Sequence, residues 1–452
     1  MSEGKLPEGW CYACVGDYLY LKNGFAFKST SYVNASEHTY PVIRISDLNG
    51  AQTSDRNAVH VLAGESGFEI NSGDLLIAMS GATTGKIGVY SGRTPAYQNQ
   101  RVGNIILHST KYGNAKYRDL LISSLSDTIL EIAYGGAQPN ISGKGIEQIT
   151  ILLPPLTEQK IIADKLDTLL AQADSAKARL EQIPQILKRF RQAVLAAAVS
   201  GKLISTNSEV NKLTRLGKIA KDIRYGTSKK CSEDKGNVAV LRIPNIGMGY
   251  IINHNLKYAD FDSKELLSLS LEKGDLLLIR SNGSVDLVGK VAVISENDIK
   301  YLFAGYLIRI RLDQEKAIPH YISFCLQSPQ LRQVIENIAR STSGVNNINS
   351  KELASLELPL PLLSEQTEIV HRVEQLFAYA DGIEKQVQNA LERVNNLTQS
   401  ILAKAFRGEL TAQWRAENPD LVRGENSAQA LLEKIQQQRA STKNIKCGKG
   451  NS

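Results

Sequence analysis

The segment GATTGKI at residues 81–87 carries the two glycines and the lysine of a phosphate-binding loop. One residue is missing between the glycines, and Ile87 stands where such a loop needs a Ser or Thr to hold magnesium. The runs on either side of the segment have the composition of strands. We therefore expect a turn between two strands here rather than a nucleotide site.

Other residue types that support catalysis are present but are not grouped. Cys11 and Cys14 have Cys-x-x-Cys spacing, yet no second pair and no nearby histidine completes a zinc site. Asp420 and Glu425 lack the lysine that a nuclease carboxylate cluster uses. The histidines form no recognisable ligand set and stand at His38, His60, His108, His254, His320 and His371. A glycine-rich cofactor motif after a strand and an Asn-Pro-Pro-aromatic methyltransferase motif are both missing. The sequence predicts no catalytic residue, no metal site and no cofactor held by this chain.

The composition is ordinary for a soluble globular protein, with 42% hydrophobic and 22% charged residues in 452. That length predicts about three domains. The start of the chain has no apolar signal core, and no apolar run approaches the 18 or more residues of a membrane span. Five scattered cysteines are too few for a disulfide framework. We expect a cytoplasmic protein that does not enter a membrane, and its net charge of +7 favours a polyanionic partner.

Two globular segments of mixed α/β character, residues 1–153 and 212–360, follow the same plan. In the first, we predict strands over 41–45, 74–78, 86–90 and 102–107, a helix over 117–132 and a loop over 135–140. The Gly-Asp-Leu-Leu segment that begins at Gly73 recurs at Gly274. Further pairs are Gly85-Lys86 with Gly289-Lys290, and Asn140-Ile141 with Asn347-Ile348. Counted from the earliest pair, Arg44 with Arg242, the offset between partners grows from 198 to 207 along the chain, as small insertions in a tandem repeat cause.

A long helix is predicted after each globular segment, over residues 154–203 and 361–410. Apolar residues recur there in alternating steps of four and three, and each position of the first helix has an apolar counterpart 207 residues later. A strict seven-residue repeat is typical of a coiled-coil seam, so we expect the helices to pack on each other; packing of each on its own domain is the alternative. The main seam positions are Ile162, Leu166, Leu169, Leu180, Leu187, Phe190, Ile369, Val373, Leu376, Ile383, Val394 and Leu397.

Local signals bound these helices. Pro184 should kink the first helix or end its regular part, because proline removes one helical hydrogen bond. Gly201 and Gly408 stand where a left-handed residue closes a helix. A polar linker is predicted over 204–211. Residues 411–452 should contain a helix near 428–439 and then a disordered basic tail from Ser441.

At the duplicated helices and the paired Gly-Asp-Leu-Leu segments, the chain resembles the specificity subunits of Type I restriction-modification enzymes, most closely the Type IA group. The resemblance is carried by LPEGW at residues 6–10, by residues 153–193 with EQKII at 158–162, and by residues 374–414 with LTQSILAKAFRGEL at 397–410.

The resemblance implies that each globular segment is a target-recognition domain for one half of a bipartite DNA sequence. It also implies that the long helices pack antiparallel, as a spacer and as the docking surface for two modification (methyltransferase) subunits. Those subunits would bring S-adenosylmethionine and methylate adenine. Two restriction (translocase and nuclease) subunits would add ATP-driven translocation and cleavage with magnesium.

Equivalent loops of the two segments should face the DNA, so residues on the paired loops are the best candidates for contact. Arginine forks at Arg44 and Arg242 suit guanine edges or phosphate, although both could instead be structural ion-pair partners. The candidate contacts are Arg44, Ser80, Lys86, Gln100, Arg101, Asn140 and Lys144 in the first segment, and Arg242, Arg280, Ser281, Asn282, Lys290, Asn347 and Lys351 in the second.

Two similar domains on a rigid spacer also suggest a molecular ruler. The helix from Thr157 to Pro184 would be roughly 40 Å long at about 1.5 Å per residue, close to one turn of B-DNA. Two other function classes stay open. One is a structural coiled-coil adaptor that binds only proteins, and a salt-dependent gel shift with duplex DNA separates it from a DNA-recognition subunit. The other is a self-sufficient methyltransferase or nuclease, against which the missing motifs argue.

Overall fold

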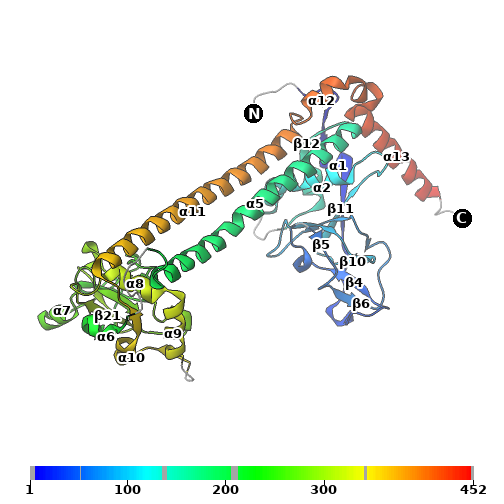
Figure 1. Ribbon diagram of the computed structural model, residues 1–452. Helices are drawn as coiled ribbons and strands as arrows, with labels where there is room; N and C mark the ends of the chain where they lie inside the picture. The colour runs from blue at the N-terminus through cyan, green and yellow to red at the C-terminus, as the bar shows by residue number, and fades with distance from the viewer. Residues whose placement is uncertain (1–5, 51, 135–139, 205–211, 341–343, 449–452) are drawn as a thin grey trace. The chain divides into compact units, whose positions relative to one another are not determined.

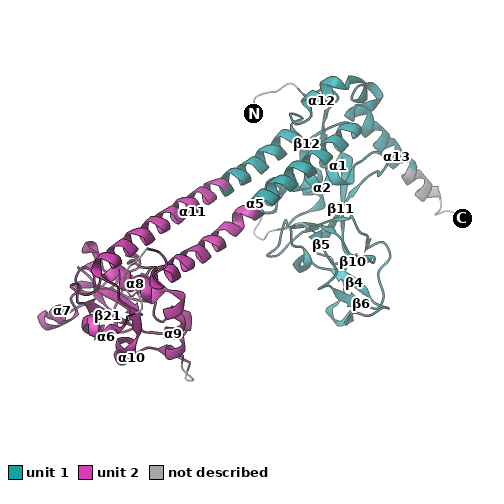
Figure 2. Cartoon of the chain, viewed as in Figure 1, with its two compact units in different colours: residues 1–178, 391–452 teal, residues 179–390 magenta. Residues whose placement is uncertain are grey.

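The computed structural model describes residues 6–50, 52–134, 140–204, 212–340 and 344–448. It divides the chain into two units, which are drawn in different colours in Figure 2. Unit 1 is Met1–Ala178 with Leu391–Ser452, and unit 2 is Arg179–Ala390. The two long helices, α5 (Leu156–Val199) and α11 (Leu363–Phe406), each contribute residues to both units.

Two five-stranded sheets form the globular part of unit 1 (Figure 1). The first has the order β2 (Leu19–Asn23), β11 (Val102–Leu107), β8 (Leu75–Ala78), β9 (Ile87–Tyr90) and β5 (Gln52–Thr53). The second has the order β3 (Tyr32–Val33), β6 (Val59–Val61), β4 (Tyr40–Ile43), β10 (Ala96–Gln98) and β7 (Glu69–Ile70). The strands predicted over 41–45, 74–78, 86–90 and 102–107 are therefore confirmed. All four residues of β8 are buried, which explains its continuous apolar run.

Short helices and one further strand pair complete this part of unit 1. They are β1 (Cys11–Cys14) paired antiparallel with β12 (Thr150–Leu153), and the helices α1 (Val15–Tyr18), α2 (Ala115–Ser124), α3 (Ser126–Tyr134) and α4 (Gly143–Glu147). The helical segment predicted over 117–132 is confirmed, and it forms two consecutive helices because the chain leaves helical geometry at Leu125, with φ −91° and ψ 5°. Of the predicted loop over 135–140, residues 135–139 lie outside the described residues.

Unit 2 repeats the topology of unit 1. Its main sheet has the order β14 (Ala220–Tyr225), β21 (Leu307–Leu312), β17 (Leu276–Ile279) and β19 (Val291–Val293), which matches β2, β11, β8 and β9 strand for strand. The other pairings are β16 (Lys257–Ala259), β15 (Val238–Leu241) and β20 (Leu302–Phe303) in one sheet, β13 (Leu213–Arg215) with β23 (Glu357–Pro359), and β18 (Ser281–Asn282) with β22 (Asn346–Asn347). Its short helices are α6 (Leu216–Ile219), α7 (Ser263–Leu269), α8 (Pro319–Gln327), α9 (Pro329–Ala339) and α10 (Ser350–Ser355). The predicted duplication is confirmed at the level of strand order.

The two long helices lie side by side and run in opposite directions (Figure 1). In unit 1, Ile162 and Leu166 near the start of α5 share a buried cluster with Ala405 near the end of α11. In unit 2, Val194 near the end of α5 shares a cluster with Ile369 near the start of α11. Each unit independently requires the antiparallel arrangement, so the predicted antiparallel coiled coil is confirmed.

Charged residues flank the apolar seam in unit 2. The Nη2 atom of Arg191 on α5 donates to Asp381 Oδ1 at 2.6 Å and to Glu384 Oε2 at 2.9 Å, both on α11. Both carboxylates raise the pKa of Arg191 above its ordinary value, against a lowering by desolvation. These two charge-assisted hydrogen bonds join the two helices at their charged edge.

Most predicted seam positions are at least partly buried. Ile162, Leu166, Leu187, Ile369 and Val373 are buried, and Leu169, Leu180, Phe190, Leu376, Ile383 and Val394 are half-buried. Leu397 is instead 54% exposed, so its predicted place in the seam is wrong. Thr398 is the half-buried residue at that level, because a helix of 3.6 residues per turn drifts around a strict seven-residue pattern.

Pro184 does not end α5, which continues as one helix to Val199. Of the two effects predicted for Pro184, an end of the regular helix is wrong, and the physical reason is local. A proline leaves only the carbonyl one turn earlier without its helical donor, and Pro184 is exposed, so water can reach this side of the helix. Gly201 and Gly408 follow the two long helices with φ of +72° and +76°, which confirms the predicted left-handed closures.

The C-terminal part of unit 1 forms α12 (Ala412–Glu417) and α13 (Ala428–Gly448). The helix predicted near 428–439 is confirmed, but the tail predicted to be disordered from Ser441 is helical as far as Gly448. The buried Leu431, Leu432 and Ile435 anchor the first turns of α13, and good helix formers such as Gln and Lys continue it. Residues 449–452, like the predicted linker from 205 onward, lie outside the described residues.

Candidate nucleic-acid interface

The chain segment that follows β8 in unit 1 and β17 in unit 2 lies between the same two neighbours in both units. In unit 1 the amide of Met79 donates to Arg101 O at 2.9 Å, and the amide of Ile141 donates to Met79 O at 2.8 Å. In unit 2 the amide of Arg280 donates to Tyr306 O at 2.9 Å, and that of Ile348 donates to Arg280 O at 2.9 Å. Positions 79 and 280 are therefore structurally equivalent.

The predicted polar pairs meet at this place. Ser80 forms an antiparallel bridge with Asn140, and Ser281 pairs with Asn347 in the β18–β22 ladder. These partners are 60 or more residues apart in the sequence. The fold brings them together because the strand that begins with the two leucines of the Gly-Asp-Leu-Leu segment ends beside the residues that precede α4 or α10.

In unit 1 the cluster is open to solvent. Ser80 is half-buried, and the other predicted residues of this group are exposed: Lys86, Gln100, Arg101, Asn140 and Lys144. The carbonyl of Lys86 accepts from the amide of Ala78 at 2.8 Å, which holds this lysine beside the end of β8. Among the described residues, none of the three cations in the group is within an ion-pair distance of a carboxylate. An exposed set of unpaired cations with amides and a hydroxyl suits a phosphate backbone and base edges.

The segment 81–87 is the turn between β8 and β9, as predicted. The hydroxyl of Thr84 donates to Gly81 O at 2.6 Å, and the amide of Lys86 donates to Thr83 O at 3.0 Å. Gly85 has φ +82°, and a Cβ there would lie 2.6 Å from Leu130 Cδ2, so glycine is required. Thr83 donates to Ile45 O at 3.1 Å, which ties the turn to the loop after β4.

The equivalent cluster of unit 2 is more enclosed. Arg280, Ser281, Asn282, Lys290 and Asn347 are half-buried, and Lys351 on α10 is exposed. Desolvation lowers the pKa of the Lys290 ammonium from its ordinary value. Among the described residues, the buried Nε of Arg280 and the buried Oδ1 of Asn347 have no hydrogen-bond partner. Buried polar atoms without partners are uncommon in folded proteins and mark places where a ligand can supply the partner.

Arg44 and Arg242 have structural contacts. Arg44 Nε is 3.4 Å from Asp47 Oδ2, and that carboxylate also accepts from the amide of Arg44 at 2.9 Å. In unit 2, Asn245 takes the place of Asp47 and accepts from the amide of Arg242, whose Nη2 donates to Asn255 O at 2.6 Å. The alternative of a structural ion pair therefore holds for Arg44. Arg242 stabilises a loop by its hydrogen bond to the carbonyl of Asn255.

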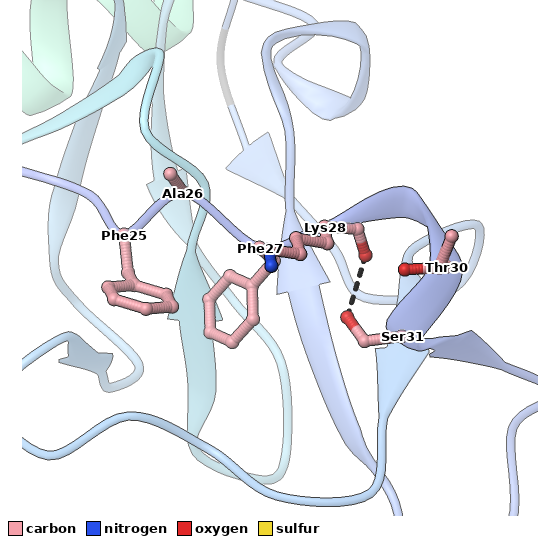
Figure 3. Close-up of a pocket in the computed structure, with 6 residues that line it drawn as sticks. All are labelled: Phe25, Ala26, Phe27, Lys28, Thr30 and Ser31. Atoms are coloured by element: carbon pink, nitrogen blue, oxygen red, sulfur yellow. Dashed lines mark hydrogen bonds between the residues drawn. The ribbon is translucent and has the colours of Figure 1, made fainter.

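Sequence reasoning missed an aromatic pocket in unit 1 (Figure 3). It has a volume of about 280 Å³ and is lined by Phe25, Ala26, Phe27, Lys28, Thr30 and Ser31. The rings of Phe25 and Phe27 meet edge to face, 5.0 Å apart, and Phe25 bridges Asn99, next to the predicted Gln100. The alternation Phe-Ala-Phe was the available signal, because it puts two rings on one side of an extended chain.

The described residues contain no group of three or more His, Cys, Asp or Glu arranged to hold a metal ion. Cys11 is half-buried, and burial raises the pKa of its thiol, with a further contribution from Asp17. Within the same described part, no helix is both long and apolar enough to cross a membrane.

Comparison with known proteins gives consistent matches along the chain. The family model for the Type I restriction modification DNA specificity domain matches twice, over residues 7–185 and 206–393; it describes a specificity domain and not a catalytic one. The chain is 43% identical to the Type I restriction enzyme EcoKI specificity subunit of Escherichia coli (strain K12), over 100% of both chains. It is also 43% identical to the StySPI specificity subunit of Salmonella potsdam, over 97% of both.

A solved structure from work on complex assembly and conformational transition of the type I R-M system has the same fold. Its TM-score is 0.70 at 18% identity, and the match covers 90% of this chain and 100% of the other. Each of the two matched regions contains one copy of the polar cluster at the end of β8 or β17. The chain belongs to the family of specificity subunits of Type I restriction enzymes, with two DNA-specificity domains.

Proposed function

We propose that the domains formed by residues 1–153 and 212–360 each read one half of a bipartite duplex DNA target. The observation that carries this proposal is the duplicated cluster at the end of β8 and β17. The same backbone contacts hold a serine and an asparagine together in each copy. Basic side chains without carboxylate partners among the described residues lie around both clusters, at Lys86, Arg101, Lys144, Arg280, Lys290 and Lys351.

Exposure divides the contacts into two groups. Exposed cations on flexible stems neutralise phosphates and give affinity without sequence information, and we assign this role to Lys86, Arg101, Lys144 and Lys351. Uncharged amides and hydroxyls are suited to base edges, and we assign this role to Ser80, Gln100, Asn140, Ser281, Asn282 and Asn347. Lys290 adds positive charge behind the second cluster. Arg44 and Arg242 position the neighbouring loops.

The antiparallel helices set the separation of the two half-sites and carry the docking surface for two modification subunits. Because α5 has 44 residues, it is about 66 Å long at about 1.5 Å per residue, not the roughly 40 Å expected from an end at Pro184. The modification subunits bind S-adenosylmethionine, and two restriction subunits bind ATP and magnesium, while this chain binds neither. The assembly acts on DNA in the cytoplasm.

The test uses this chain assembled with its modification subunits. Sequencing of N6-methyladenine in cells that express the complex gives the target, and gel shifts then compare that duplex with a scrambled duplex over a range of salt concentrations. We expect two short defined blocks separated by an unread gap, and specific binding that weakens as salt rises. Equal binding to both duplexes at every salt concentration contradicts the proposal.

A further inference from the structure

Arg280 of unit 2 is held in one orientation by two contacts. Its guanidinium lies over the ring of Tyr225, 4.5 Å from the ring centroid, and its Nη1 donates to Gly305 O at 3.0 Å. Tyr225 is fixed in turn, because its hydroxyl accepts from the amide of Ser350 at 2.7 Å. An arginine stacked on an aromatic face loses little further freedom when it binds a planar partner.

The charge of Arg280 has no carboxylate partner among the described residues, whereas four other buried or half-buried arginines each have one. Arg118 pairs with Asp119, Arg309 with Asp222, Arg311 with Asp275 and Arg415 with Glu158. Nη2 of Arg280 has no acceptor in the described part of the chain, and its Nε is buried without one. Asp286, on the turn after β18, pairs with neither Arg280 nor Lys290. The structure therefore holds the guanidinium of Arg280 in one orientation and leaves its Nη2 and Nε donors without acceptors among the described residues.

The two units differ at this position. The equivalent of Arg280 in unit 1 is Met79, which is only 8% exposed and cannot donate a hydrogen bond. Neighbours of Arg280 are of the base-reading type, since Ser281 pairs with Asn347 and Asn282 pairs with Asn346. The guanidinium of Arg280 is held in one orientation and lies among neutral amides and a hydroxyl. This arrangement suits the paired acceptors O6 and N7 of guanine in the major groove better than it suits a phosphate, which a mobile side chain can contact.

We infer that Arg280 reads one guanine in the half-target bound by unit 2, and that Tyr225 is the residue that positions its fork. The inference rests on the proposed function. It adds the base that is read, the side chain that reads it and a difference between the two half-targets. Because Met79 replaces the arginine, unit 1 has no guanine contact at the equivalent position.

The test uses the complex with its modification subunits and duplexes that carry 7-deazaguanine at one guanine of the target at a time. For the unaltered protein we expect one guanine whose N7 matters, with binding weakened roughly 5- to 150-fold. Arg280→Met and Arg280→Lys should bind the unmodified duplex more weakly and become insensitive to 7-deazaguanine at that guanine alone. Because the DNA is changed rather than the protein, the first measurement is independent of variant folding.

Variants at Tyr225 separate positioning from structure. Tyr225→Phe keeps the ring and should retain the sensitivity to N7, whereas Tyr225→Leu should reduce discrimination at the same guanine and leave the other target positions unchanged. Three outcomes overturn the inference: no guanine whose N7 matters, an Arg280→Met complex with the original sensitivity, or an Arg280→Met complex weakened equally on all duplexes with a smaller salt dependence. In each case sequence-specific binding by the unaltered complex still supports the proposed function, which fails only if that binding is missing.

Discussion

Arg415 donates from Nη1 to Glu158 Oε1 across 257 residues of sequence, and both side chains are buried in unit 1. The other oxygen of Glu158 accepts from Trp10 Nε1 at 2.8 Å, and Thr411 donates to Oε1 at 2.6 Å. Nη2 of Arg415 donates to Gly408 O at 2.8 Å. One carboxylate thus joins the start of the chain, the first turn of α5 and the segment after α11.

Arg415→Met should destabilise unit 1 by about 3–5 kcal/mol, because it leaves Glu158 buried without its counter-charge. The measurement is the urea midpoint of unfolding, followed by tryptophan fluorescence, since Trp10 contacts the same carboxylate. Arg423→Ala is the matched control: it removes a pair with Glu8 in which both side chains are at least half exposed, and it should leave the midpoint nearly unchanged. If both variants shift the midpoint equally, the buried network is not what secures this end of the chain.

Lys86→Ala should weaken binding to all duplexes by a similar factor and reduce the slope of log K against log salt by about 0.9. Lys86 is exposed beside the end of β8 and has no carboxylate partner among the described residues, as a phosphate contact requires. Salt titrations by gel shift provide the measurement. Lys300→Ala, at an exposed position outside both clusters and both long helices, is the control with the same change of charge. A loss confined to one target sequence would assign Lys86 to a base instead.

Insertion of four residues at matching levels of α5 and α11 should lengthen the unread gap between the half-sites. Each insertion adds about 6 Å, at about 1.5 Å per residue, which is close to two base pairs of about 3.4 Å. Methylome sequencing reads the spacing directly. As a control, the same four residues are placed in the segment 204–211, which should leave the gap unchanged. Unchanged spacing in the helix variant contradicts the ruler.

Stability should fall in mildly acidic solution because of His108. Its Nε2 lies 3.0 Å from Gly16 O, so the neutral ring donates to that carbonyl, and the ring stacks on Tyr20. Burial lowers the pKa of His108 below 6.5, against a raising effect of the bond to Gly16. The unfolded chain then binds the proton more readily than the folded one, so this contribution is present above pH 6.5 and is lost as the pH falls toward the lower folded value.

The check is the melting temperature of the protein and of His108→Gln at pH values from about 7.5 to about 5.5. The difference between the two should change in favour of the variant as the pH falls, because glutamine takes up no proton. Parallel curves would mean that His108 has the same proton affinity in both states.

Local pattern in the sequence determined the repeated architecture. The alternating steps of four and three fixed the two helices, since helical periodicity is a property of neighbours in the chain. Runs such as Leu75–Ala78 gave the buried strands, and Gly201 and Gly408 gave the helix closures, for the same local reason. The repeat alone pairs Ser80 with Ser281 and Asn140 with Asn347.

Contacts between distant residues were decided only by the tertiary structure. No local pattern shows that Tyr225 stacks on Arg280, that Leu397 is exposed, or that the helix continues past Pro184. Each outcome depends on which residues pack against a side chain and on whether water reaches it. The spacing of residues along the sequence gives neither the packing partner nor the solvent exposure. The sequence by itself determined a duplicated DNA-recognition domain on paired helices. Tertiary packing decided which side chains remain available to contact DNA.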